Sequence, residues 1–317
     1  MINARVFDTF EEMQASPWLQ SVHRQFSADL WPIECIRCQQ SESIGQESIR
    51  LFSLKLHDTL SEKRPDYLIV GGVLDNICNS ACQSCNAGLS TKIGYLQNQK
   101  NFELIDNKSL FDQLPQDRII QIDLNGGEPT ASPGYQRVLN NLPESVTDVR
   151  LNTNASRLLP NIENLLDRGI NLTVTISLDG IDKIHDYVRW PITWKTFTQT
   201  VNQYKSYATR FENLSLNFWT TVHCFNLDNL ENIIEYASDT GIVWAFGLLN
   251  LPKELNIAHQ NKFTLAAKKK LSLSTNKICS KLCDITATEL NNDRELSQYI
   301  EQQDNLRSIT IKDFVKI

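Results

Sequence analysis

From Asp66 to about residue 255, the chain alternates six short, apolar, β-branched runs with segments of helical periodicity. The apolar runs read YLIVGGV, RIIQIDL, VTDVRLNT, NLTVTISL, LSLNFWTTVH and GIVWAFGLL. Between them stand helical patterns such as SPGYQRVLNNL, WKTFTQTVNQYKSYA and LDNLENIIEYASDTG. Strands that alternate with helices are typical of a parallel α/β sheet. Six such units predict a partial (β/α)6 TIM-like barrel rather than a small doubly wound sheet.

This pattern divides the chain into three predicted regions. Residues 1–64 carry apolar side chains at broadly helical spacing and are expected to form an N-terminal accessory region. Residues 65–255 form the predicted barrel. Residues 256–317 read as a C-terminal helical region, for which the N-terminal region is the predicted packing partner. With 41% hydrophobic and 21% charged residues, the chain has the composition of a globular protein with a core.

Charge and targeting signals limit the partners and the compartment. The net charge of −6 provides no polybasic surface, so neither nucleic acid nor an acidic membrane is an expected partner. The N-terminal MINARVFDTFEEMQ lacks a signal-peptide pattern, and no apolar run reaches the roughly 18 residues of a membrane span. We therefore expect a cytoplasmic protein. In that compartment, eight cysteines favour metal ligation or redox chemistry over disulfides.

Polar residues gather where the predicted strands end. In a parallel α/β sheet the active site lies at the carboxyl ends of the strands. The segments at those ends are, in chain order, CNSACQSC (78–85), NGGEPT (125–130), NTNAS (152–156), SLDG (177–180) and the pair His223 and Cys224. We expect all of them to converge on one mouth of the barrel.

The first of these segments suggests a metal centre. Cys78, Cys82 and Cys85 are separated by three and then two residues, and no fourth cysteine is adjacent. A structural zinc site normally takes four protein ligands, often as two pairs. An iron–sulfur cube held by three thiolates instead leaves one iron open to a small molecule. The alternatives are a structural zinc and buried free thiols.

Residues at the other strand ends suit a small polar ligand. Gly126 and Gly127 let the backbone approach closely, and Glu128 offers a carboxylate to an ammonium group. Asp179 is a candidate acceptor for ribose hydroxyls. The alternative is that these residues only shape turns, since Gly-Gly, Glu-Pro and Asp-Gly are common turn pairs.

In the order and strand position of these motifs, the chain resembles the radical S-adenosylmethionine (SAM) enzymes. The resemblance rests on the Cys-x3-Cys-x2-Cys run, GGEP at 126–129 and SLDG at 177–180, and covers roughly residues 65–255. It implies that Cys78, Cys82 and Cys85 bind a 4Fe-4S cluster whose open iron chelates SAM. One electron, from a flavodoxin or ferredoxin-type donor, then gives a 5′-deoxyadenosyl radical that abstracts hydrogen from the substrate.

The same resemblance implies which residues contact SAM. They are Gly126, Gly127, Glu128, Asn154, Ser177, Asp179 and Arg189. Arg189 stands in HDYVRW, where the alternative is a surface role beside Trp190.

A second cysteine pair, Cys35 and Cys38, lies in the N-terminal region. It resembles the terminal pair of twitch or SPASM-type accessory modules, which bind auxiliary iron–sulfur clusters and usually follow the barrel. The pair here precedes it, so we expect an N-terminally placed or degenerate module. Cys279 and Cys283, spaced for one helix face, are the candidates for completing a four-cysteine auxiliary cluster or zinc site. The alternative is four free thiols.

The resemblance also implies a substrate class and an extra catalytic candidate. Accessory modules of this type favour a peptide or protein substrate that is crosslinked, epimerised or oxidised. Cys224 is a candidate hydrogen donor, as in the peptide epimerases of the superfamily, and the alternative is a buried core cysteine. Two other functions stay open, namely radical chemistry on a sugar or nucleotide derivative and a non-catalytic, metal-stabilised binding scaffold.

Overall fold

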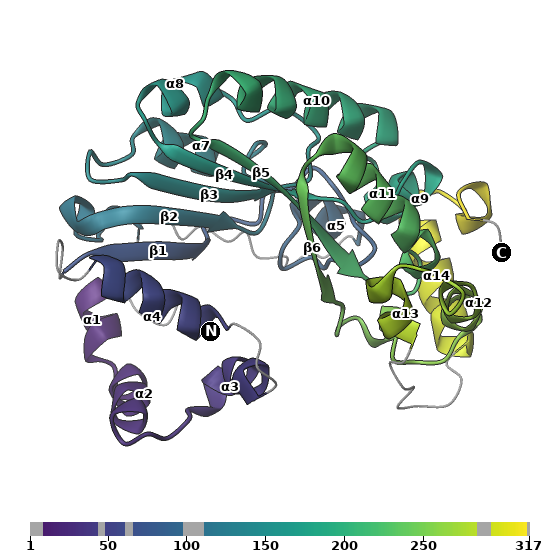
Figure 1. Ribbon diagram of the computed structural model, residues 1–317, viewed down its shortest axis with the longest axis horizontal. Coiled ribbons are helices and arrows are strands. Elements are labelled where there is room, and N and C mark those ends of the chain that lie inside the picture. The colour runs from purple at the N-terminus through teal and green to yellow at the C-terminus, as the bar shows by residue number, and fades with distance from the viewer. Residues whose placement is uncertain (1–8, 44–47, 61–65, 98–110, 284–292, 316–317) are drawn as a thin grey trace.

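Six parallel strands form one sheet in the order β1-β2-β3-β4-β5-β6. The computed structural model describes the chain except for residues 1–8, 44–47, 61–65, 98–110, 284–292 and 316–317. The strands are β1 (Leu68–Val73), β2 (Ile119–Asn125), β3 (Asp148–Thr153), β4 (Asn171–Ser177), β5 (Leu214–Val222) and β6 (Val243–Leu248). Each predicted apolar run forms one strand, and the sheet curves with β1 and β6 as its open edges (Figure 1). The predicted α/β fold of the partial-barrel type is confirmed.

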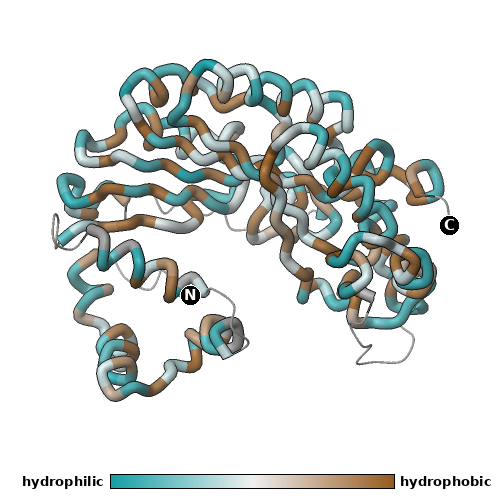
Figure 2. The backbone as a smooth tube through the Cα atoms, in the orientation of Figure 1, coloured by the Kyte–Doolittle hydropathy of each residue, from teal (hydrophilic) through white to brown (hydrophobic). Residues whose placement is uncertain are grey.

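Helices cover the convex face of the sheet (Figure 1). They are α7 (Pro133–Asn140), α8 (Ile162–Asp167), α10 (Trp194–Arg210) and α11 (Leu230–Thr240). Local sequence sets where they begin: the Ser132 side chain caps α7, with Pro133 in its first turn, and the Thr193 side chain caps α10. Figure 2 shows mainly hydrophilic residues on the outer side of these helices.

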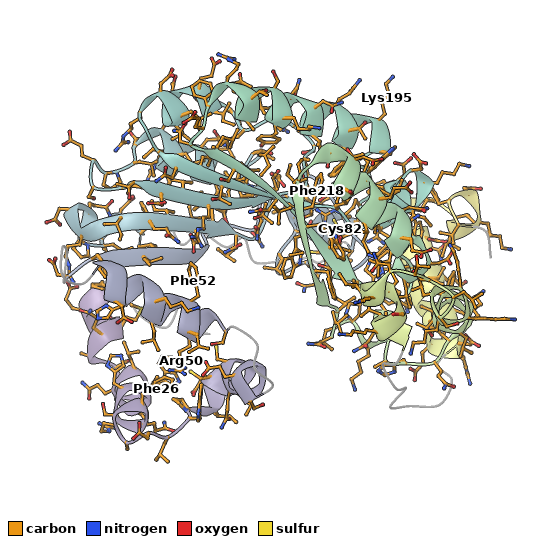
Figure 3. The ribbon with its side chains drawn as sticks, viewed as in Figure 1. Phe26, Arg50, Phe52, Cys82, Lys195 and Phe218 are labelled. Carbon is orange, nitrogen blue, oxygen red and sulfur yellow. The ribbon has the colours of Figure 1, made fainter. Side chains whose placement is uncertain are left out.

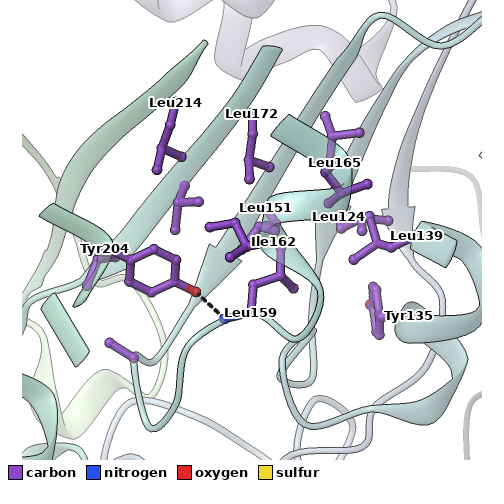
Figure 4. Close-up of a cluster of buried hydrophobic side chains, with 14 of the residues drawn as sticks. Leu124, Tyr135, Leu139, Leu151, Leu159, Ile162, Leu165, Leu172, Tyr204 and Leu214 are labelled. Atoms are coloured by element: carbon purple, nitrogen blue, oxygen red, sulfur yellow. Dashed lines mark hydrogen bonds between the residues drawn. The ribbon is translucent and has the colours of Figure 1, made fainter. Parts of the chain in front are cut away.

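The main hydrophobic core lies between the strands and these helices. In β4, Leu172, Val174 and Ile176 are buried, whereas the alternate residues are not. Figure 4 shows part of this core, in which the Tyr204 hydroxyl accepts a hydrogen bond from the Leu159 N–H at 3.0 Å. Because successive side chains point to opposite faces of a strand, the other face carries polar residues such as Thr175. The inner face of the sheet is therefore polar and partly accessible.

Two shorter helices lie near the carboxyl ends of the strands. They are α5 (Thr91–Leu96) and α9 (Lys183–Val188). Between β1 and α5 runs the cysteine loop, by which we mean residues 74–90. Figure 3 shows Cys82 of this loop beside the strand ends, near the centre of the molecule.

The terminal regions are helical and lie at opposite edges of the sheet (Figure 1). The N-terminal helices are α1 (Phe10–Ala15), α2 (Pro17–Ser27), η2 (Ile33–Cys35), α3 (Ile36–Ser43) and α4 (Ile49–Leu60). The C-terminal helices are α12 (Lys262–Leu271), α13 (Lys277–Cys283), α14 (Asp293–Arg307) and η6 (Ile311–Asp313). The three-region division of the chain stays a prediction, but the figure shows one helical region near β1 and the other beyond β6.

A contact between a guanidinium and an aromatic ring joins the N-terminal helices to the inner face of the sheet. The Arg150 guanidinium of β3 lies 5.3 Å from the centre of the Phe52 ring of α4. Among the helices that the structure describes, none is long and apolar enough to cross a membrane.

Candidate functional site

The cysteine loop is fastened to both neighbouring helices through its main chain. On the α5 side, the Cys78 N–H donates to the Thr91 hydroxyl at 3.0 Å, and that hydroxyl donates to the Cys78 carbonyl at 3.1 Å. On the α9 side, the Gln83 N–H donates to the Val188 carbonyl at 2.9 Å. A loop without regular structure thus has its backbone bonds satisfied from outside, as a buried segment requires.

Two of the three thiols of the loop lie beside the hydroxyl of Ser80. The Cys78 and Cys82 sulfurs stand 3.3 and 3.5 Å from the Ser80 hydroxyl. Burial raises the pKa of the Cys78 thiol, and burial together with the nearby Cys82 raises the pKa of Cys85 to about 12. Without a metal, the raised pKa values keep Cys78 and Cys85 protonated, and binding of a metal would release these protons.

The number of these thiols bears on the kind of metal group that fits. In the part of the chain that the structure describes, no three His, Cys, Asp or Glu side chains are arranged to hold a single metal ion. A structural zinc normally takes four protein ligands, whereas this loop offers three thiols. An iron–sulfur cluster held by three thiolates leaves one iron open to a small ligand. The donor set fits such a cluster.

A cavity of about 210 Å³ opens beside the thiols at the carboxyl ends of the strands. It brings together residues that the sequence distributes over several strand ends. Of the predicted site residues, those that line it are Cys78, Cys82, Cys85, Gly126, Gly127, Glu128, Asn154, Ser177 and Arg189. Asp179 does not line the cavity, but its carboxylate forms an ion pair with Arg189, which does.

Both glycines after β2 occupy positions that a larger residue would not tolerate. Gly126 has a φ of 79° and Gly127 a φ of 51°, in the left-handed region. A Cβ atom at Gly127 would stand 2.6 Å from the Ile77 carbonyl oxygen, and one at Gly126 would stand 2.6 Å from Val73. The backbone after β2 therefore lies directly against the start of the cysteine loop.

Glu128 ties this turn to the end of β3. One carboxylate oxygen accepts hydrogen bonds from the Thr130 N–H at 3.1 Å and from the Thr130 and Thr153 hydroxyls at 2.7 Å each. The other accepts from the Asn154 N–H at 2.6 Å. Glu128 is only 1% exposed, and no basic side chain of the described residues forms an ion pair with it. Because a buried charge favours a counter-charge, this carboxylate fits an ammonium group in the cavity.

Asn154 and Ser177 complete this side of the cavity. The Asn154 side-chain amide donates to the Asn79 side-chain oxygen at 2.9 Å and to the Ser80 hydroxyl at 3.1 Å. The end of β3 is thereby bonded to the cysteine loop. Ser177 is the last residue of β4 and reaches the cavity directly.

Arg189 and Asp179 form a buried ion pair at the edge of the cavity. Their side chains are 12% and 4% exposed, with 3.0 Å between Nη1 and Oδ2. The other Asp179 oxygen accepts from the Thr221 N–H at 2.8 Å. The Arg189 Nε is buried and has no hydrogen-bond partner among the described residues, so a donor is left free beside the cavity. A carboxylate or hydroxyl of a bound ligand fits it.

Cys224 and His223 lie in the core rather than at the cavity. Both are 1% exposed, and Cys224 packs in an apolar cluster with Tyr187, Phe225 and Leu255. Burial raises the pKa of the Cys224 thiol and lowers the pKa of His223 to about 4. Neither residue lines the cavity beside the cysteine loop. The packing of Cys224 matches the core alternative, and the hydrogen-donor role gains no support from it.

The two outlying cysteine pairs are not brought together among the described residues. Cys35 and Cys38 belong to η2 and α3, near β1, whereas Cys279 of α13 is buried in an apolar cluster beyond β6 (Figure 1). The Cys283 side chain lies outside the described residues. Cys35 and Cys38 therefore lie apart from Cys279 in the described chain, and the four-cysteine auxiliary site stays a prediction.

Two residues of α14 reach the cysteine loop although the sequence did not single them out. They are Tyr299 and Arg307, which hydrogen-bond to carbonyl groups of the loop. The sequence predicted only a helical region around them. The only local signal was two large polar side chains eight residues apart on one predicted helix, which is too common to identify a site.

The family model described as "Radical SAM superfamily" matches residues 73–237, just over half of the chain. Among curated proteins, the sporulation killing factor maturation protein SkfB of Bacillus subtilis (strain 168) is 24% identical over 168 residues, which are 53% of this chain and 39% of SkfB. The mycofactocin maturase MftC of Mycobacterium tuberculosis (strain ATCC 25618 / H37Rv) is 26% identical over 114 residues, 35% of this chain and 28% of MftC. The matches thus span well under half the length of these relatives.

Two solved structures give weaker likenesses. Streptococcus suis SuiB bound to the precursor peptide SuiA has 12% identity and a TM-score of 0.43, over 87% of this chain and 58% of SuiB. Native anSMEcpe with bound AdoMet has 14% identity and a TM-score of 0.43, over 76% of this chain and 62% of that one. These likenesses add nothing to the fold described above.

Proposed function

The chain belongs to the radical SAM superfamily, and we propose that it is an enzyme that modifies a peptide or protein at an unactivated C–H bond. The observation that carries this proposal is a single cavity lined by three thiols, the two glycines after β2, Glu128 and Arg189. The superfamily implies a 4Fe-4S cluster and SAM as cofactors, and the donor set of the cavity fits both.

Different residues of the cavity would bind the cluster and SAM. Cys78, Cys82 and Cys85 would bind the cluster as thiolates, giving up their protons on binding. Glu128 would face the ammonium group of SAM, and the free Nε of Arg189 would donate to its carboxylate or a ribose hydroxyl. When bound, the cluster and SAM supply a 5′-deoxyadenosyl radical. The protein's part is to orient the ligands and exclude water from the cavity.

A peptide substrate is supported by two kinds of observation. SkfB is named a maturation protein and MftC a maturase. In addition, the inner face of the sheet carries polar side chains such as Thr175, together with Trp219, which is 43% exposed. Hydrogen-bonding groups and an exposed indole suit a peptide chain. Crosslinking, epimerisation and oxidation would all begin with the same hydrogen abstraction.

The cofactor part is tested by anaerobic reconstitution with iron and sulfide, followed by a dithionite-driven assay for 5′-deoxyadenosine. We expect about four irons per chain and SAM cleavage. Cys82→Ala should lose both, whereas Cys279→Ala, which removes a buried thiol beyond β6, should keep both. About eight irons per chain would instead support an auxiliary cluster. Zinc without cleavage would overturn the proposal in favour of the binding-scaffold alternative.

The substrate part needs a separate measurement. Short peptides encoded beside the gene would be added to the reduced enzyme with SAM and followed by mass spectrometry. A mass change that depends on SAM and on Cys82 supports peptide modification. SAM cleavage that increases only with a sugar or nucleotide derivative would replace the peptide with a small molecule. The proposed physiological electron donor is a flavodoxin or ferredoxin. Replacing dithionite with such a protein in this assay tests the proposal.

A further inference from the structure

Helix α14 contacts the cysteine loop from the far end of the chain. Arg307 is 4% exposed, and its guanidinium donates from Nε to the Ala81 carbonyl at 2.8 Å and from Nη2 to the Cys82 carbonyl at 3.3 Å. The Tyr299 hydroxyl donates to the next carbonyl, that of Gln83, at 2.5 Å. Three consecutive carbonyl groups between the first and last cysteine are thus bonded to one helix.

The Arg307 side chain is itself held in place. Its Nη1 donates to the Gln303 carbonyl at 3.0 Å and to the Gln303 side-chain oxygen at 2.5 Å. Among the described residues, no carboxylate forms an ion pair with Arg307. Burial lowers the pKa of this guanidinium. A buried cation of this kind favours a negative charge nearby, and the cysteine loop is where such a charge arises when the thiols ionise.

A second set of bonds fixes α14 against α9. Asp304 accepts from the Tyr187 hydroxyl at 3.0 Å and from the Ile311 N–H at 2.8 Å. The carboxyl end of α9 in turn accepts the Gln83 N–H through the Val188 carbonyl. The cysteine loop, α9 and α14 therefore form a closed ring of contacts, in which each part limits the movement of the others.

We propose that Tyr299 and Arg307 are positioning residues of the metal centre: both fix the main chain of the cysteine loop, and the charge of Arg307 stabilises the loop when it bears a cluster. The charge role of Arg307 rests on the proposed function of the loop. One-electron reduction adds negative charge to a cluster, so a fixed cation nearby favours the reduced form. Loss of that cation then makes the reduction potential more negative.

The positioning role is tested with the metal-free chain. Tyr299→Phe removes one hydroxyl and keeps the ring. The matched control is Tyr204→Phe, which also removes one buried hydroxyl bonded to the backbone, at Leu159. The rate at which iodoacetamide alkylates Cys78, Cys82 and Cys85 is followed by mass spectrometry. We expect about a fivefold faster reaction in Tyr299→Phe, from loss of one hydrogen bond, and no change in Tyr204→Phe. Equal rates in Tyr299→Phe and the parent chain would overturn the positioning role.

The charge role of Arg307 is tested on the reconstituted protein by a dithionite titration that is followed by electron paramagnetic resonance. Arg307→Gln should shift the cluster potential to a more negative value, whereas Arg307→Lys, which keeps the charge, should restore it. The control is Arg168→Gln, because Arg168 also donates to two backbone carbonyls, those of Leu142 and Pro143. A purely structural role would lower iron loading in both Arg307 variants without shifting the potential of the clusters that form.

These readouts separate the two proposals. An unchanged potential in Arg307→Gln, with a cluster present, overturns the charge role alone. A parent chain that takes up no iron overturns the proposed function and with it the charge role. The alkylation rates still decide whether α14 positions the loop, because they need no metal.

Discussion

The strand-end site and the N-terminal helices each contain cysteines spaced as in metal sites, yet they differ in everything around those cysteines. At the strand ends, buried polar groups such as Glu128 and Asn154 have bonded partners from other loops. In the N-terminal region, Cys35 and Cys38 are half-buried, and the neighbouring Ile33 is 76% exposed. A cysteine motif therefore supports a functional assignment when the fold brings complementary groups to it, and spacing by itself does not suffice.

The sharpest way to break this comparison is to remove one cysteine from each region. We expect Cys85→Ser to abolish iron uptake on reconstitution, because the loop supplies all three predicted ligands. Cys38→Ser should leave the iron content unchanged. Iron analysis of the two variants beside the parent decides the matter, and loss of iron from Cys38→Ser would place a metal site in the N-terminal region after all.

Alanine substitutions at Gly127 and Gly169 test how closely the turn after β2 lies against the cysteine loop. Gly127→Ala would bring a Cβ to 2.6 Å from the Ile77 carbonyl oxygen, in a left-handed backbone. We expect a loss of about 3 kcal/mol or more in the free energy of unfolding. Gly169→Ala has the same backbone strain, with a φ of 81°, but its Cβ would meet no described atom within 4 Å, so it should cost only about 1 kcal/mol. Urea unfolding of both variants measures the difference, and equal losses would mean that the close approach is unimportant.

A pair of carboxylates tests the value of buried polar bonding. Glu128→Gln would set an amide group against the donors of Thr130, Thr153 and Asn154, and should destabilise the fold by about 2 kcal/mol. It should also weaken SAM binding at least tenfold in calorimetry, because the counter-charge for the ammonium group is lost. Glu42→Gln, at the N-terminal pair of Glu42 with Arg50, should destabilise the fold much less, because exposed ion pairs contribute little. Similar losses at the two positions would remove the contrast between the regions.

The smallest effect concerns pH. Burial lowers the pKa of His223 to about 4, below the usual value of about 6.5 for an unfolded chain. The unfolded state then binds more protons than the folded state between these values. The stability from this residue is therefore complete above about pH 6.5 and is lost as the pH falls towards 4. Between pH 6.5 and 5 the loss should be about 1.5 kcal/mol, and His223→Gln should show a flatter pH profile of urea midpoints. An unchanged profile would mean that His223 does not contribute.

Much of the fold was predictable because strand and helix signals are local. The alternation of apolar residues in NLTVTISL places every second side chain on the core side, and the structure buries Leu172, Val174 and Ile176 accordingly. The strand-end rule then predicted that the cysteine loop, GGEP and SLDG would meet. Nine of the predicted residues do line one cavity, since parallel strands end at one edge of the sheet.

Other features depended on contacts between distant segments. Nothing local to Arg307 indicates that its guanidinium bonds to the carbonyls of Ala81 and Cys82, more than two hundred residues away in the chain. The same is true of Cys35 and Cys279, whose separation follows from where each helical region lies relative to the open sheet (Figure 1). The sequence by itself determined the strands, the order of the motifs and the chemistry of their side chains, because these follow from residue type and short periodicity. Only the tertiary structure decided which motifs share a site and which helix holds the cysteine loop, because packing between distant segments leaves no periodic signal in the chain.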